Sequence, residues 1–184
     1  MGQKAITIYT PSSASPHITA DDDAFTYASL AGIDSGILGG LSCTKVDNNT
    51  VRLSGGGAMN RGHIIRIPTG ENLDLTVETG TAGATRYDSV VAEFVKGGGN
   101  DADTYEIKVI KGTTSPPSLT TSNLTAAGNV NQVELYRLYI NGTALSTITQ
   151  KAPSINRAPA IYYGNGEPPA SLGVDGDIYF KIVN

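Results

Sequence analysis

The sequence is poor in the residues that disulfides, metal sites and charged binding surfaces require. It has one cysteine, Cys43, no tryptophan and two histidines among 184 residues. A lone cysteine cannot form an intrachain disulfide, so packing or association must hold the fold together. Charged residues make up 16% of the chain, against roughly 25% in an average globular protein. We therefore expect a surface covered mainly with small neutral polar groups.

The chain also lacks an excess of basic residues. Its 13 Lys and Arg face 17 Asp and Glu, which gives a formal net charge of −4. Nucleic-acid binding depends on basic side chains that neutralise phosphates, so nucleic acid is not an expected partner. No segment approaches the ~20 consecutive apolar residues of a membrane span, and residues 1–13 have no apolar core of a secretory signal. We expect no membrane insertion, and synthesis in the cytoplasm without a signal peptide.

Signatures of catalysis and of metal binding are missing as well. His17 and His63 have no carboxylate at a fixed short spacing, and the sequence contains no GxSxG, HExxH, P-loop or CxxC motif. The acidic clusters at 21–23, 101–103 and 175–177 do not follow the EF-hand spacing, and helix capping or solvated turns explain them more simply. We predict a protein that is not an enzyme, with no catalytic, cofactor-binding or metal-binding residues.

What the sequence does contain is alternation of apolar and polar residues. Residues 72–78 (NLDLTVE) place apolar side chains on one face and polar side chains on the other, as in a half-buried strand. Nine segments predict strands in this way: 4–9, 50–53, 63–67, 72–78, 89–95, 104–110, 133–140, 145–149 and 177–183. This number of short strands predicts an all-β fold, an antiparallel β-sandwich of jelly-roll-like type.

Glycine-containing pairs separate the predicted strands. Asn141-Gly142 is the strongest hairpin signal, because these residues tolerate the positive φ that a tight reversal needs. One segment departs from the β pattern: Thr19 as N-cap, three aspartates at 21–23 and Gly32 as the end predict one short N-terminal helix. Residues 113–131, rich in Pro, Thr, Ser and Asn, predict a long surface connection.

A change of composition after Gln150 indicates two parts. We assign residues 1–150 to the β-sandwich and residues 151–184 to a linker followed by a C-terminal β-hairpin that acts as an oligomerisation element. Adjacent strand residues point to opposite faces, so Tyr162 and Tyr163 cannot both be buried in a half-exposed hairpin. The apolar C-terminal run needs a partner strand or chain as cover. The candidate oligomer interface is Tyr162, Tyr163, Tyr179, Phe180 and Ile182.

An ordered series of motifs resembles a domain of baseplate and tail-associated structural proteins of phages and prophages, particularly those of Gram-positive hosts. The motifs are residues 50–58 (TVRLSGGGA), 61–67 (RGHIIRI), 73–75 (LDL), 86–92 (RYDSVVA), 108–112 (KVIKG) and 134–138 (ELYRL). Residues 20–38 are similar to the entry segment of this family. Within the 86–92 motif we expect Arg86 or Asp88 to hold a turn.

Residues 163–180 (YGNGEPPASLGVDGDIYF) resemble a short module of phage tail fibres and related trimeric proteins. This resemblance implies a homotrimer, with other tail or baseplate proteins as partners, and a place in the virion. It leaves open whether the chain binds a host surface polysaccharide or only joins other tail parts; a bound glycan would be held by avidity. The alternatives are a bacterial carbohydrate-binding or adhesin domain and, less favoured, a polysaccharide-degrading enzyme. No ligand-binding residue is assigned.

Overall fold

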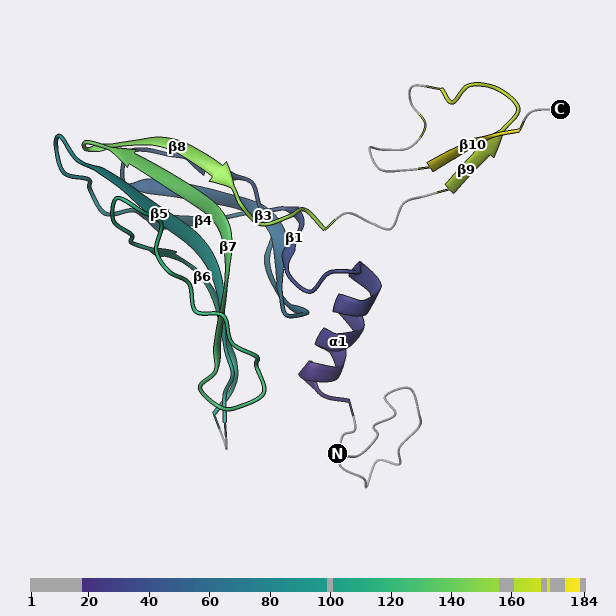
Figure 1. The fold of residues 1–184 in the computed structure, drawn as a ribbon, viewed down its shortest axis with the longest axis horizontal. Helices are drawn as coiled ribbons and strands as arrows, with labels where there is room; N and C mark the ends of the chain where they lie inside the picture. The colour runs from purple at the N-terminus through teal and green to yellow at the C-terminus, as the bar shows by residue number, and fades with distance from the viewer. Residues whose placement is uncertain (1–17, 99–100, 156–160, 170–171, 173–177, 183–184) are drawn as a thin grey trace.

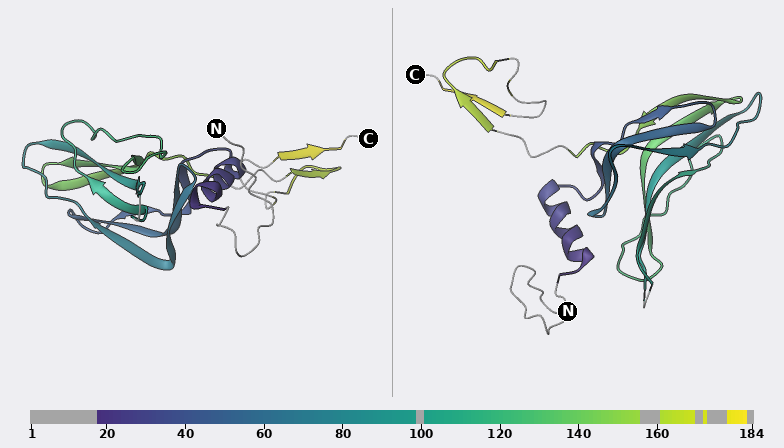
Figure 2. Two further views of the ribbon diagram at one scale, coloured as in Figure 1. Left: turned by 90° about the horizontal axis from the view of Figure 1, so that it is seen from below. Right: turned by 180° about the vertical axis from the view of Figure 1, so that it is seen from behind.

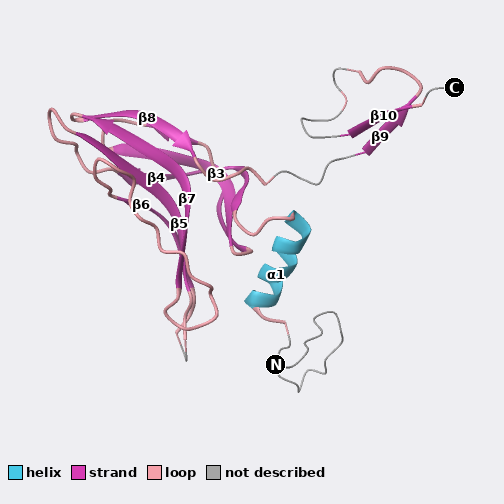
Figure 3. Cartoon of the chain, in the orientation of Figure 1, coloured by secondary structure: helices cyan, strands magenta, loops and turns pink. Residues whose placement is uncertain are grey.

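We describe a computed structural model of the chain, which defines residues 18–98, 101–155, 161–169, 172 and 178–182. One helix, α1 (Ala20–Ala31), precedes all strands. The strands are β1 (Gly36–Gly40), β2 (Cys43–Lys45), β3 (Thr50–Asn60), β4 (His63–Thr76), β5 (Thr85–Val95), β6 (Thr104–Ile110), β7 (Val130–Asn141), β8 (Ala144–Gln150), β9 (Ile161–Gly164) and β10 (Ile178–Lys181). Figure 1 and Figure 3 show their arrangement.

Two four-stranded antiparallel sheets face each other. In the first sheet β3 pairs with β4 along one side and with β1 and β2 along the other; the second sheet has the order β6-β5-β7-β8. The second view in Figure 2 and contacts from β3 to β5 and β7 place the sheets face to face. The predicted all-β antiparallel sandwich is confirmed.

Three details of the fold differ from the sequence expectation. The first four strands form one sheet and the next four the other, whereas jelly-roll connections alternate between sheets, so the jelly-roll detail is wrong. The segment 63–67 and residues 72–76 of the segment 72–78 belong to one long strand, β4, which ends at Thr76. The C-terminal pair is not a β-hairpin: β9 and β10 pair in parallel, Ile161 with Ile178 and Tyr163 with Phe180. The predicted strand at 4–9 lies outside the described residues.

The core lies between the sheets and is built from the inward faces of β3, β5 and β7. Fully buried residues include Leu53 from β3, Val90 from β5, and Leu135 and Leu138 from β7. Fully burying one such side chain stabilises the fold by about 1.5–3 kcal/mol. A buried polar group joins the sheets: Asn60 Nδ2 of β3 donates to the carbonyls of Ala92 and Asn131 at 3.0 and 2.9 Å.

The helix has the ends that its sequence predicts. The Thr19 hydroxyl accepts from the Asp22 amide, the Asp22 carboxylate accepts from the Thr19 amide at 2.7 Å, and Gly32 ends the helix with φ of 69°. Among the helix residues only Ala24 is buried. It packs against the turn between β3 and β4, where a Cβ on Gly62 would lie 2.0 Å from the Ala24 carbonyl oxygen. Glycine at position 62 therefore permits the close approach of α1.

Tight turns join the long strands. The Arg61-Gly62 turn joins β3 to β4, with φ of 52° and 83°, a combination that suits a two-residue hairpin turn. Gly142, with φ of 58°, begins the turn between β7 and β8, so the hairpin predicted at Asn141-Gly142 is confirmed. Residues 111–129 contain no extended strand and form the predicted long connection.

Candidate functional site

The Arg86–Asp88 pair lies on the inward side of β5 and joins two loops. Asp88 is fully buried; it accepts from Arg86 Nε and Nη2, both at 2.9 Å, and from the Gly112 amide at 3.0 Å. Arg86 Nη2 also donates to the Glu78 carbonyl at 2.6 Å. The side chains thus connect the segment after β4 to the start of the long connection, as expected of residues that hold turns.

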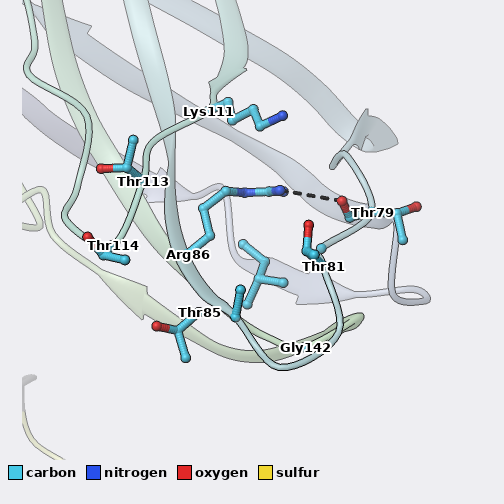
Figure 4. Close-up of a pocket in the computed structure, with 11 residues that line it drawn as sticks. Thr79, Thr81, Thr85, Arg86, Lys111, Thr113, Thr114 and Gly142 are labelled. Atoms are coloured by element: carbon cyan, nitrogen blue, oxygen red, sulfur yellow. Dashed lines mark hydrogen bonds between the residues drawn. The ribbon is translucent and has the colours of Figure 1, made fainter.

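A pocket of about 320 Å³ opens beside this pair and is shown in Figure 4. Arg86 extends across it toward Thr79, while Thr113 and Thr114 lie on the other side. Lys111 at the rim donates to the Glu78 carboxylate, which holds the pKa of Glu78 below its usual value. Five threonines and the apolar side chain of Ile140 complete the lining: Thr79, Thr81, Thr85, Thr113 and Thr114. This lining offers hydroxyl groups but no paired carboxylates and no histidine.

The predicted interface residues are divided between the two faces of the β9–β10 pair. Tyr163 and Phe180 are neighbours on one face and are 77% and 58% exposed. Ile182 follows two residues after Phe180; it continues the ladder through its amide, which donates to the Gly164 carbonyl at 2.8 Å, and it is also exposed. Tyr162 and Tyr179 are paired on the opposite face and are half-buried. Alternation along the strand thus separates Tyr162 from Tyr163 as expected.

Sequence reasoning missed the two isoleucines that complete this face. Ile161 and Ile178 are paired directly and are 63% and 44% exposed. Their parallel register, which the hairpin interpretation did not allow, places them beside Tyr163 and Phe180. We call these four residues together with Ile182 the C-terminal apolar face. Figures 1 and 2 show β9 and β10 apart from both sheets in every view.

Exposed apolar side chains are concentrated at the two ends of the described chain. Thirteen large hydrophobic residues are exposed; five lie within residues 18–33 and six within residues 161–182. In the sandwich between them the exposed ones are Val46 and Ile64. Monomeric proteins rarely leave large contiguous apolar patches in water, which makes these two segments candidate interaction sites.

A second depression lies beside α1. It has a volume of about 600 Å³ and is bounded by α1, the β3–β4 turn, the end of β5 and residues 123–125 of the long connection. His63 lines it, with its ring stacked on Phe94 at 4.0 Å between centroids. Burial is the main cause that lowers the pKa of His63, although Asp21 lies 3.6 Å from Nε2 and acts in the opposite direction. We call this depression the α1 groove.

Three further features of the described residues concern metal binding, the cysteine and the helix. No group of three or more His, Cys, Asp or Glu side chains lies close enough to hold a metal in the ranges that the structure defines. Burial raises the pKa of the Cys43 thiol to about 11, which leaves it unreactive near neutral pH. Within the part of the chain that the structure describes, α1 is the single helix, and it is not long and apolar enough to cross a membrane.

Comparison with known proteins gives no relative: no family model matches the chain, and no curated protein matches its sequence.

Proposed function

We propose that this protein is a non-enzymatic structural component of a phage tail, baseplate or fibre, and that it assembles as a homotrimer. The observation that carries the proposal is the location of the exposed apolar residues. They flank a sandwich whose own surface is polar, and they include Tyr163 and Phe180 from the interface suggested by the sequence. Symmetric association would cover these side chains and the free edges of the β9–β10 pair.

The β9–β10 strand pair needs a further packing partner to be stable. Two strands alone are marginal in water, and three or more strands or a packed partner are normally needed. On its second face, Tyr179 donates its hydroxyl to the Gly166 carbonyl at 3.0 Å. That bond joins Gly166 to β10 but leaves Tyr163 and Phe180 in solvent. A neighbouring copy of the chain would supply the missing layer.

Contact with a host surface glycan is a second role, favoured by the threonine pocket. Its hydroxyl-rich lining, with Lys111 at the rim, suits a polyhydroxylated ligand, and a trimer would present three such pockets and add their weak affinities. The test is sedimentation of the protein with Gram-positive cell walls. Lys111→Ala together with Thr113→Val would reduce the bound fraction several-fold, and equal binding of variant and wild type would reject this role.

The tail assignment itself is tested by locating the protein. Tail particles purified from an induced culture of the strain that encodes it would be analysed by mass spectrometry and by immunogold labelling. We expect the protein in a fixed ratio to the other tail proteins, with label at one end of the particle. Recovery only in the culture supernatant or cytoplasm, with particles free of it, would contradict the assignment.

A further inference from the structure

The α1 groove has apolar residues in its lining that a single copy of the chain leaves uncovered. Ala24, Phe25 and Ala28 of α1 line it together with Leu124 of the long connection. Phe25 is 67% exposed. An apolar side chain seated there would remove the Phe25 ring from water, which favours association.

The charged groups around the groove already have partners within the chain. Asp21 Oδ1 accepts from Lys96 Nζ at 2.7 Å, and Arg61 Nη1 donates to Asp34 Oδ2 at 2.9 Å. Lys96 also lies 3.5 Å from Asp103 Oδ2. A charged or strongly polar occupant would have to break these pairs to gain its own, so the groove suits a neutral, apolar occupant.

Charge indicates which surface of a second copy fits. The helix carries acidic residues at 21–23 and no basic residue, so helices from several copies meeting on a symmetry axis would bring like charges together. The C-terminal apolar face has only Ile, Tyr and Phe side chains. The nearby Lys181 and Glu167 form an ion pair with each other. The face therefore brings no acidic group toward the helix.

We propose that the C-terminal apolar face of one copy seats in the α1 groove of the next, with Tyr163 and Phe180 against Phe25 and Ala28. The inference rests on the proposed homo-oligomer and specifies its contact. Each copy then binds one neighbour through its C-terminal apolar face and the other neighbour through its α1 groove. Such a head-to-tail contact closes into a ring of three if each copy is rotated by a third of a turn relative to the one before it. A single kind of interface then covers both Phe25 and the C-terminal apolar face.

The first test replaces one aromatic residue at a time, either in the α1 groove or in the C-terminal apolar face. Phe25→Ser and Phe180→Ser should each raise the protein concentration at which half of the oligomer dissociates by about tenfold or more. Each substitution deletes a buried ring from every contact between copies. Val46→Ser on the sandwich and Leu30→Ser on the other side of α1 are matched controls, because both residues are exposed but neither lines the groove. A Leu30→Ser effect as large as that of Phe25→Ser would move the contact away from the groove and overturn the proposal. Circular dichroism melting checks that each variant folds.

The second test reads the head-to-tail arrangement directly. In a Cys43→Ala background, one chain carries Ala28→Cys in the groove and another carries Ile182→Cys at the end of the apolar face; both are treated with a short bismaleimide. We expect a cross-linked dimer when the two chains are coexpressed, and none when either is made alone. Dimers of the Ile182→Cys chain alone would mean that the faces meet each other.

The outcomes separate the two proposals. A wild-type oligomer without the mixed cross-link leaves the homo-oligomer standing and rejects the groove contact, in favour of another occupant such as a glycan or a second tail protein. A wild-type monomer at all concentrations rejects both proposals.

Discussion

Replacing Asp88 by alanine should be the most destabilising single change on the sandwich that leaves its hydrophobic core intact. Asp88 is fully buried and receives three hydrogen bonds, two from the Arg86 guanidinium and one from the Gly112 amide. The side chain of Arg86 is only 12% exposed. Without the carboxylate, Arg86 keeps its charge in a site that water barely reaches. Breaking a buried pair in this way costs about 3–5 kcal/mol.

Urea denaturation followed by circular dichroism measures this cost as a fall in the free energy of unfolding, with the denaturant slope unchanged. The matched control is Asp74→Ala. Asp74 also receives two bonds from one arginine, Arg52, at 2.6 and 2.7 Å, but both side chains are more than two-fifths exposed. Exposed pairs contribute little, so this variant should unfold at the wild-type urea concentration. Equal effects of the two substitutions would refute the reasoning that burial determines how much an Asp–Arg ion pair contributes to the free energy of unfolding.

Three further predictions follow from buried or crowded positions. Asn60→Asp turns a donor facing two carbonyl oxygens into an acceptor and should cost several kcal/mol in the same urea assay, whereas an unchanged midpoint would mean that the Asn60 amide does not bridge the sheets. Gly62→Ala places a methyl group against Ala24 and should reduce the helical circular dichroism signal; an undiminished signal would contradict the close packing of α1. The pKa of Cys43 is raised from 9.0 to about 11, so the stability due to the neutral thiol is complete below pH 9 and is lost as the pH rises toward 11. Cys43→Ala should flatten that decline, and an identical decline in this variant would assign it to other groups.

Short-range patterns in the sequence predicted the strands and the helix well. Alternation identified segments in β3 to β8, and Thr19 with Gly32 gave both ends of α1 because capping depends on neighbouring residues. Strands β1 and β2 were missed, since Gly36–Gly40 (GILGG) has three glycines and no alternation, and Cys43–Lys45 is too short to show alternation. The division into 1–150 and 151–184 stays a prediction.

Features that depend on distant pairing could not be read from the sequence. The composition of the chain after Gln150 suggested a C-terminal hairpin, yet β9 and β10 pair in parallel. That register is what brings Ile161 and Ile178 beside Tyr163 and Phe180. The α1 groove combines residues from four separate segments of the chain. No local sequence pattern predicts that these segments lie side by side in the fold. The turn-holding role of Arg86 was anticipated from its motif, but its carbonyl partner at Glu78 required the fold.

The most direct test of the account is the mass of the purified chain in solution, measured by light scattering after size exclusion at several concentrations. The account predicts a stable mass of three times the 19.1 kDa chain, with dissociation in the Phe180→Ser variant at the same concentration. A wild-type mass of 19.1 kDa at every concentration would contradict it, because Phe25, Tyr163 and Phe180 would then remain in water without a partner chain.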